Sequence, residues 1–313
     1  MRLDTRAGSS ESDLAEARII AAAAEEHDGA SPVSDQALLA AAQHERRLLL
    51  FTEQGAQDPA AFGIVGQGEV DLVVRPDARG RGIGSAALAA LLDDAPRDTE
   101  LLSWAHGVNS AAEALLSRHG FQPVRTLLRM ALDPAELPRG GDPLAIATPD
   151  GLTLHAFDPD RPEDAGVWVR ANAAAFATHP EQGRITEADF ALIREETWFD
   201  PADLILLVAT EGPSAGEAAG STWIKTVRDG EVETELYAVG VRPEYAGAGL
   251  GRLLLDVTLA RMAQHEPSRV TLYVDGENER AVRMYERAGF TVDSRSRQWR
   301  RAPMSEPGAT MDA

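Results

Sequence analysis

An internal repeat is the feature of this sequence that most restricts its fold. Residues 73–84 read VVRPDARGRGIG and residues 240–251 read GVRPEYAGAGLG, so two glycine-rich segments stand 167 positions apart. An asparagine followed by a helical pattern and a Gly-Phe pair also occurs twice, over 109–121 and 278–290, with a spacing of 169. Both motifs recur in the same order at nearly the same spacing. The sequence therefore predicts a duplicated unit of about 150 residues, much longer than the units of solenoid repeats.

The boundary between the two copies is predicted where the composition changes. Residues 133–151 read DPAELPRGGDPLAIATPDG and are dense in Pro, Gly and Asp, which is typical of a linker. The predicted domains are residues 1–140 and 150–300, and residues 301–313 are predicted to be a disordered tail.

Each copy shows the same order of predicted elements: antiparallel strands first, then a strand–glycine turn–helix–strand–helix–strand unit. This order predicts a mixed α/β fold (α+β, with a mixed sheet) in both domains. In the first copy the predicted helices are 13–26, 34–44, 83–94 and 110–119, and the strands are 47–52, 61–65, 69–74, 100–105 and 127–132. In the second copy the helices are 163–176, 187–197, 250–264 and 279–287, and the strands are 152–157, 204–209, 220–227, 233–241, 269–274 and 291–298.

Composition excludes several classes of protein. The 30 basic and 50 acidic residues give a net charge of −20, which argues against a nucleic-acid-binding surface. With no cysteine, the chain can form neither disulfides nor zinc–thiolate sites, in keeping with a reducing cytoplasm. No apolar run is long enough to span a membrane. We therefore expect a soluble, cytoplasmic protein.

A strand that enters a glycine-rich turn and then a helix is a candidate anion site, because backbone N–H groups and the helix dipole converge there. A dinucleotide fold would need a third glycine where Ser85 and Arg252 stand. A phosphate-binding loop of the G-K-[ST] type would need a lysine, and neither turn has one. The pattern [Arg/Gln]-x-x-Gly-x-Gly/Ala, which holds the pyrophosphate of an acyl-coenzyme A, is matched in full by residues 79–84. A plain strand-to-helix turn is the remaining alternative.

At these motifs the sequence resembles the GCN5-related N-acetyltransferase (GNAT) superfamily, in tandem. The second copy is also similar to the mycothiol synthase family, in the segments NAAAFA (172–177), HPEQG (179–183), WFDP (198–201), WIKT (223–226), ELYAVGV (235–241) and LYV (272–274). This resemblance implies acetyl-CoA as the donor substrate. No cluster of His, Asp and Glu has the spacing of metal ligands, so we expect no metal. It implies as acceptor the cysteinyl amine of cysteinyl-glucosaminyl-inositol, whose acetylation is the last step of mycothiol biosynthesis.

The resemblance assigns the coenzyme contacts to the two glycine turns, the strands before them and the helix after Asn278. The first copy contributes Leu72, Val73, Val74, Gly80, Arg81, Gly82, Ile83, Gly84 and Ser85. The second contributes Val239, Gly240, Val241, Ala246, Gly247, Ala248, Gly249, Leu250, Gly251, Arg252, Asn278, Arg280 and Arg283.

The two turns are not equivalent. The first has Arg79 and Arg81 where the second has Ala246 and Ala248, which departs from the family pattern. We therefore expect weaker or faster-exchanging CoA binding in the second half, where backbone amides would hold the pyrophosphate with help from Arg252 or Arg283.

In the family resembled, a glutamate at the position of Glu235 is the general base and a tyrosine at Tyr285 is the general acid. The repeat spacings place Gly68 opposite Glu235 and Leu116 opposite Tyr285. The first copy would then lack both groups, unless a one-residue bulge brings Glu69 into register. We expect a first domain that binds CoA without catalysing transfer, and a catalytic second domain.

The acceptor carries an ammonium, a thiol and many hydroxyls. The positions that match acceptor contacts of the family are Asp35, Glu181, Lys225, Glu235 and Tyr273. Each has a plainer alternative: Asp35 as an N-cap or first residue of a helix, Glu181 and Lys225 as solvated charges, and Tyr273 as strand packing. Lys225 is the only lysine in the chain. His179 and Trp198 are predicted to be structural.

These observations together predict an N-acetyltransferase that works through a ternary complex and acts as a monomer. Two alternatives remain: a GNAT enzyme that acetylates another amine, such as an aminoglycoside or a protein N-terminus, and a non-catalytic acyl-CoA-binding sensor. A sensor would need neither Glu235 nor Tyr285.

Overall fold

The computed structural model describes residues 3–96, 98–177 and 182–303, and of Asp35 it describes the backbone alone. The helices are α1 (Glu11–Asp28), α2 (Asp35–Ala42), α3 (Ile83–Asp94), α4 (Ser110–Arg118), α5 (Pro162–Ala175), α6 (Glu187–Ile193), α7 (Leu250–Ala263) and α8 (Glu279–Arg287). The strands are β1 (Leu3–Gly8), β2 (Arg47–Glu53), β3 (Ala61–Gly66), β4 (Glu69–Val74), β5 (Leu101–Ala105), β6 (Gln122–Leu132), β7 (Leu152–Ala156), β8 (Leu204–Ala209), β9 (Ala218–Asp229), β10 (Glu231–Val241), β11 (Arg269–Asp275) and β12 (Thr291–Arg301).

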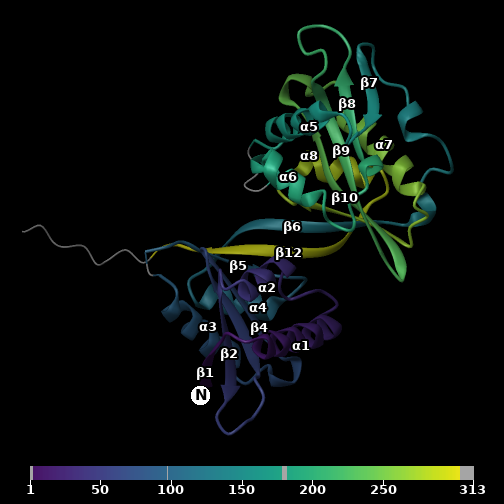
Figure 1. Cartoon of the computed structure of the whole chain (residues 1–313). Helices are drawn as coiled ribbons and strands as arrows, with labels where there is room; N and C mark the ends of the chain where they lie inside the picture. Colours follow the sequence, from purple (N-terminus) through teal and green to yellow (C-terminus); the bar gives the residue numbers. More distant parts are fainter. Residues whose placement is uncertain (1–2, 97, 178–181, 304–313) are drawn as a thin grey trace, which may run out of the picture. The chain divides into compact units, whose positions relative to one another are not determined.

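The chain forms two compact units of mixed α/β structure, as the repeat predicts (Figure 1). Among the described residues, unit 1 takes 3–128, 275–277 and 294–303, and unit 2 takes 129–274 and 278–293. The strand order is β1-β2-β3-β4-β5-β12 in unit 1 and β6-β11-β10-β9-β8-β7 in unit 2. In each unit the strand before the glycine turn therefore lies between an antiparallel strand and a parallel one.

The last strand of each unit comes from the other copy of the repeat. Arg297–Arg301 of β12 pair antiparallel with Leu101–Ala105 of β5, and Trp299 is buried in the core of unit 1. Conversely, the end of β6, from Arg129 onward, belongs to unit 2 beside β11. The units therefore differ from the predicted division into 1–140 and 150–300, because two similar terminal strands can occupy each other's places. Arg301 lies in β12 rather than in a tail, and residues 304–313 lie outside the described residues.

Each unit has two apolar cores, one on either face of its strands. In unit 1, α1 and α2 pack on one face through residues such as Ile20 and Ala24, and α3 and α4 pack on the other through Leu88 and Leu116. In unit 2 the α5 and α6 face is aromatic, with Trp168 and Phe190 against Trp223, and the α7 face is aliphatic. Buried apolar area of this kind stabilises the strands that position the site.

None of the helices in the described part of the chain combines the length and the apolar character that crossing a bilayer requires.

Candidate active site

The two glycine turns have the same backbone conformation. Gly80 and Gly82 have φ of 76° and 83°, and Gly247 and Gly249 have φ of 86° and 80°, a region that glycine adopts without strain. Gly82 and Gly249 are also the N-caps of α3 and α7, and neither helix start has a side-chain cap. The first N–H groups of both helices are thus free of side-chain acceptors, as a phosphate site requires.

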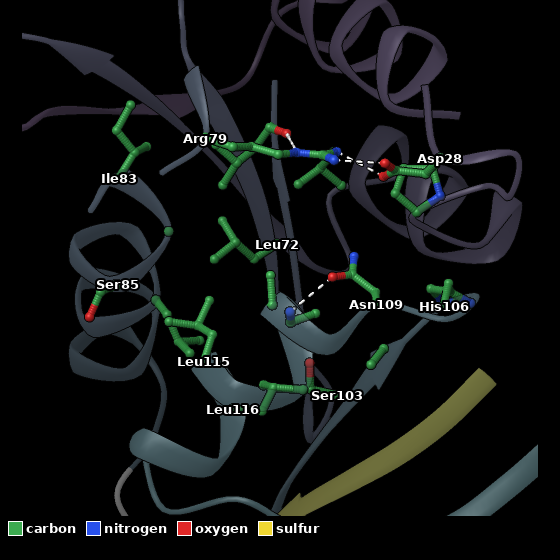
Figure 2. A pocket seen from close by; sticks show the side chains of 18 of the residues that line it. Asp28, Leu72, Arg79, Ile83, Ser85, Ser103, His106, Asn109, Leu115 and Leu116 are labelled. Carbon is green, nitrogen blue, oxygen red and sulfur yellow. Dashed lines mark hydrogen bonds and ion pairs between the residues drawn. The ribbon is translucent and has the colours of Figure 1, made fainter. Parts of the chain in front are cut away.

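The turn of unit 1 opens on a cavity of about 560 Å³ (Figure 2). The cavity lies between the glycine turn, the ends of β4 and β5, and α4. It is lined by every coenzyme residue predicted in the first copy except Arg81. Figure 2 shows Leu72, Leu115 and Leu116 along its walls, with Arg79 and Asp28 at one rim and His106 at another.

The arginines of the first turn are held by protein acceptors. Arg79 donates to both carboxylate oxygens of Asp28, at 2.7 and 2.8 Å, and from Nε to the Val74 carbonyl at 3.1 Å (Figure 2). Arg81 donates to the Ala78 carbonyl and pairs with Glu53. A bound pyrophosphate would therefore compete with carboxylates for these side chains, while the backbone amides of the turn remain available.

The predicted helper arginines of unit 2 are in a similar position. Arg252 pairs with Asp256 at 2.9 Å and Arg283 with Glu279 at 2.8 Å, each one helical turn away. The side-chain oxygen of Asn278 accepts from the Ala281 amide and caps α8. Because both arginines are paired, the groups at this turn that can contact the coenzyme are mainly its backbone N–H groups.

The strand that feeds each turn separates from its parallel neighbour. Among the described residues of unit 1, Glu69 opposite Leu102 is the pair recorded between β4 and β5. In unit 2, β10 pairs with β11 from Glu233 to Leu236. Beyond these points no further parallel pair is recorded among the described residues. In unit 1 the ends of β4 and β5 line the cavity there.

A β-bulge distinguishes unit 2 at the point of separation. The register of β10 on β9 shifts between Leu236 and Ala238, so Tyr237 is an extra residue, whereas β4 pairs with β3 without interruption. A bulge turns the local backbone and redirects its amides and side chains. It lies two residues after Glu235, where the predicted catalytic group stands.

Glu235 lies in a partly buried site among cations. It stands opposite Lys225 on β9 and Thr271 on β11. The ammonium of Lys225 lies 5.3 Å from the centre of the Trp198 ring, which fixes its position above the aromatic core. Burial raises the pKa of Glu235, and the nearby charges of Lys225 and Arg129 oppose this effect. A carboxylate with a raised pKa is suited to accept a proton near neutral pH.

The counterpart of Glu235 in unit 1 is Glu69 rather than Gly68. The bulge adds one residue to β10, so residues before it align one position later than the glycine turns imply. The strand registers agree: Glu69 pairs with Leu102 and Glu235 with Thr271, and 271 − 102 is 169, the spacing of the Asn motifs. The first copy has therefore kept a carboxylate at this position.

That carboxylate is engaged in a buried ion cluster. Arg46, whose side chain is 4% exposed, donates to Glu69 at 2.9 Å and to Asp71 at 2.6 Å. Glu69 thus has an arginine partner at hydrogen-bond distance in unit 1.

Tyr285 is buried on α8 with its ring edge-on to Phe290, at 6.0 Å between centroids. Burial raises the pKa of its phenol well above the usual range. The hydroxyl therefore keeps its proton at physiological pH, which a proton donor requires, although burial also makes the phenol a weaker acid. The ring of Tyr285 also packs against Phe290, which is compatible with a role for its hydroxyl.

Leu116 occupies the corresponding position of α4 and is 5% exposed in the core of unit 1. We expect Leu116→Ala to lower the free energy of unfolding by roughly 2–5 kcal/mol because it leaves a cavity. Turnover should stay within about twofold, because no proton transfer is assigned to unit 1. Urea unfolding and steady-state assays of the full chain measure both quantities. A large loss of turnover in a folded variant would contradict the assignment.

The predicted acceptor residues are brought together in part. Lys225, Glu235 and Tyr273 belong to adjoining strands of unit 2, and the Tyr273 side chain is 49% exposed. Asp35 is the first residue of α2, with Ser34 as its N-cap, and its side chain is not described. Glu181, like His179, lies outside the described residues.

Sequence reasoning missed Arg129, which forms an ion pair with Asp293 and whose charge lowers the pKa of Glu235. It comes from β6, a strand that the repeat assigns to the first copy. Within the described residues, no cluster of three or more His, Asp or Glu side chains is arranged to hold a metal ion.

Comparisons with known proteins agree on one family. A family model described as "Acetyltransferase (GNAT) family" matches residues 19–121 and 169–290. The chain is 40% identical over 294 residues to a "Mycothiol acetyltransferase" of Thermomonospora curvata, covering 91% of this chain and 92% of the relative. It is 37% identical over 298 residues to a protein of the same name from Pseudarthrobacter chlorophenolicus, covering 89% of each.

Solved structures show the same fold at lower identity. A GCN5-related N-acetyltransferase from Sphaerobacter thermophilus matches 97% of this chain and 96% of its own, with a TM-score of 0.69 and 24% identity. A tandem GNAT protein from the clavulanic acid biosynthesis pathway matches 97% of this chain and 100% of its own, with a TM-score of 0.67 and 18% identity.

Proposed function

Because this chain belongs to the GNAT acetyltransferase family and, within it, to the mycothiol acetyltransferases, we propose that it acetylates the cysteinyl amine of cysteinyl-glucosaminyl-inositol with acetyl-CoA. The predictions of an N-acetyltransferase with two tandem GNAT domains are confirmed by this membership. The observation that best supports the proposed chemistry is the pair of proton-transfer groups in unit 2: Glu235 opposite Lys225 beside the bulge of β10, and the buried phenol of Tyr285 where unit 1 has Leu116.

The proposed reaction begins with the acceptor amine. Glu235 takes a proton from the ammonium, directly or through water, and the freed nitrogen attacks the thioester carbonyl. Negative charge develops on the carbonyl oxygen, and the N–H groups of β10 beyond the bulge at Tyr237 are the donors proposed to stabilise it. The C–S bond then breaks, and the sulfur receives the phenolic proton of Tyr285. The nitrogen loses its second proton as the amide forms, and that proton returns to the phenolate of Tyr285 through water. Products are the acetamide and CoA, with the proton taken up by Glu235 released to solvent.

Unit 1 is proposed to bind CoA without catalysing transfer. It has the glycine turn and an open cavity for the coenzyme. The proton acceptor there is tied to Arg46, and Leu116 stands in place of the phenol. Without a proton donor at the sulfur, the departing group would leave as a free thiolate.

A matched pair of variants tests the two coenzyme sites. Gly82 and Gly249 have nearly equal φ, and a Cβ on either would meet no atom within 4 Å, so Gly82→Asp and Gly249→Asp carry similar structural costs. Each adds a negative charge where a pyrophosphate would lie and should weaken CoA binding at its own turn by roughly tenfold or more. Calorimetric titration with CoA should detect two sites in the wild type and one site in each full-length variant. Turnover should fall in Gly249→Asp and persist in Gly82→Asp; the reverse would contradict the assignment.

The decisive experiment offers acetyl-CoA with four candidate acceptors: cysteinyl-glucosaminyl-inositol, the same sugar lacking cysteine, an aminoglycoside and a peptide. Because the first acceptor has a thiol of its own, released CoA and acetylated product should be separated by chromatography rather than detected with a thiol reagent. We expect fast turnover with the first acceptor alone. Fast turnover with an aminoglycoside or peptide would assign a different substrate, and none with any amine would favour a sensor.

A further inference from the structure

One polar residue stands in the row of β5 side chains that faces α3 and α4. Alternate residues of a strand share a face, so Leu101, Ser103 and Ala105 form this row, and its two apolar members belong to the core beneath those helices. Ser103 is 7% exposed and lines the cavity of unit 1. Among the described residues, none forms a hydrogen bond with its hydroxyl. Because a buried hydroxyl without a partner is costly, its partner is expected from the cavity.

The corresponding positions of unit 2 carry the opposite pattern. The strand registers that align β4 with β10 and β5 with β11 place Leu272, which is fully buried, at the position of Ser103. On the helix that follows each strand, Leu116 of α4 corresponds to Tyr285 of α8. Each unit therefore has one hydroxyl in this pair of positions, on the helix in unit 2 and on the strand in unit 1.

This pair of positions marks one end of the bound coenzyme. Ser103 and Leu116 both line the cavity of unit 1, and Figure 2 shows both on the side away from Arg79. A coenzyme with its pyrophosphate at the glycine turn would extend along β4 toward this side. Because Tyr285 is the proposed donor to the sulfur in unit 2, the position of Leu116 indicates where the thioester end would lie in unit 1.

The thioester would find few other hydrogen-bond donors at this end of the cavity. In unit 2 the proposed donors to the carbonyl oxygen follow the bulge at Tyr237, whereas β4 of unit 1 pairs with β3 without interruption. The neighbouring wall residues Leu72, Leu115 and Leu116 are apolar. A hydroxyl can donate one hydrogen bond, and a carbonyl oxygen is a better acceptor than a sulfur with two carbon substituents.

We propose that Ser103 is a ligand-binding residue of unit 1: its hydroxyl donates a hydrogen bond to the thioester carbonyl of an acyl-CoA, so that unit 1 recognises the acylated coenzyme. The proposal rests on the proposed binding of CoA by unit 1. No covalent bond forms or breaks, since the serine keeps its proton and the thioester stays intact. Such a contact suits a unit that binds the coenzyme without catalysing transfer.

The test uses full-length Gly249→Asp, in which coenzyme binding is expected to remain at unit 1. Two ligands are titrated by calorimetry: acetyl-CoA, and desulfo-CoA, whose chain ends in a methyl group in place of the thiol. Adding Ser103→Ala should weaken acetyl-CoA binding by roughly three- to tenfold, the effect of one hydrogen bond between neutral groups, and leave desulfo-CoA binding within about twofold. Ser103→Thr keeps the hydroxyl and should keep acetyl-CoA affinity within about threefold.

Ser85→Ala is the matched control. Ser85 also lines the cavity, but it lies in the first turn of α3, where its hydroxyl is hydrogen-bonded with His119 at 3.0 Å. Its loss should change the affinities for acetyl-CoA and desulfo-CoA by the same factor. An equal loss for both ligands in Ser103→Ala would mean that Ser103 acts through the shape of the cavity, and would overturn the proposal.

A spectroscopic readout reports the hydrogen bond itself. Acetyl-CoA labelled with 13C at the thioester carbonyl should show a higher chemical shift when bound to Gly249→Asp than when free, because a hydrogen bond polarises the carbonyl. Adding Ser103→Ala should remove most of this change. If Ser103→Ala alters neither the shift nor the affinity, the role of Ser103 is refuted and coenzyme binding by unit 1 stands. If Gly249→Asp binds neither ligand, the proposed coenzyme site of unit 1 is wrong and the inference falls with it.

Discussion

Tyr285→Phe is expected to lower kcat by roughly a hundredfold or more, the usual contribution of a general acid. The substitution removes one oxygen from a buried ring and keeps its edge-on contact with Phe290, so the fold of α8 should be preserved. Affinity for CoA should change little, because the proposed coenzyme contacts are backbone groups of the glycine turn. The expected loss of kcat therefore reflects slower breaking of the C–S bond rather than weaker binding of CoA.

The control removes a phenolic oxygen elsewhere in the same unit. Tyr245 lies in the 3-10 turn Pro243–Tyr245 and packs against the α7 core, with no proton transfer assigned to it. Tyr245→Phe should keep turnover within about twofold. Equal losses of turnover in both variants would mean that the substitutions act through packing rather than through proton transfer. Unchanged turnover in Tyr285→Phe would remove the acid role and leave the thiolate to depart unassisted.

The fold was predictable because its elements have strong local patterns. Residues 69–74, 83–94, 204–209 and 279–287 form elements with the predicted boundaries, since burial on the strands and capping on the helices are visible in sequence. The strand β1 was missed: it pairs with β2 at the sheet edge and is mostly exposed, so it leaves no apolar alternation. Exchange of β6 and β12 was missed for another reason, because strands with similar patterns do not reveal which unit they join.

The site was predictable where backbone geometry dictates residue type. Glycine at 82 and 249 reflects a positive φ that few other residues tolerate, and both turns adopt it. Register was open in the sequence: the spacing of the glycine turns aligns Gly68 with Glu235, and the bulge that aligns Glu69 instead was only an alternative until the extra residue at Tyr237 was seen. Arg129 gave no signal either, since its partner Asp293 is 164 positions away in the sequence and meets it only through the sheet.

Glu235→Gln is expected to lower the rate by roughly a hundredfold near neutral pH, and by more as the pH falls. In the wild type, burial raises the pKa of Glu235, so the carboxylate becomes protonated, and the rate falls, at a higher pH than for an exposed glutamate. The amide cannot take up a proton. The variant must then rely on the small fraction of acceptor amine that is already neutral, and this fraction grows about tenfold per pH unit below the amine pKa. A steep rise of residual kcat with pH is the expected signature.

Glu233→Gln provides the comparison, because Glu233 lies two residues earlier on β10, is exposed and faces Arg269. It removes the same charge from the same strand without touching the proposed proton path, and its pH profile should match that of the wild type. A loss in Glu235→Gln that is uniform across pH, with a raised KM for the acceptor, would assign Glu235 to binding the ammonium. The proton would then have to leave by water, because the other carboxylate retained at this position of the repeat, Glu69, is bound to Arg46 in unit 1.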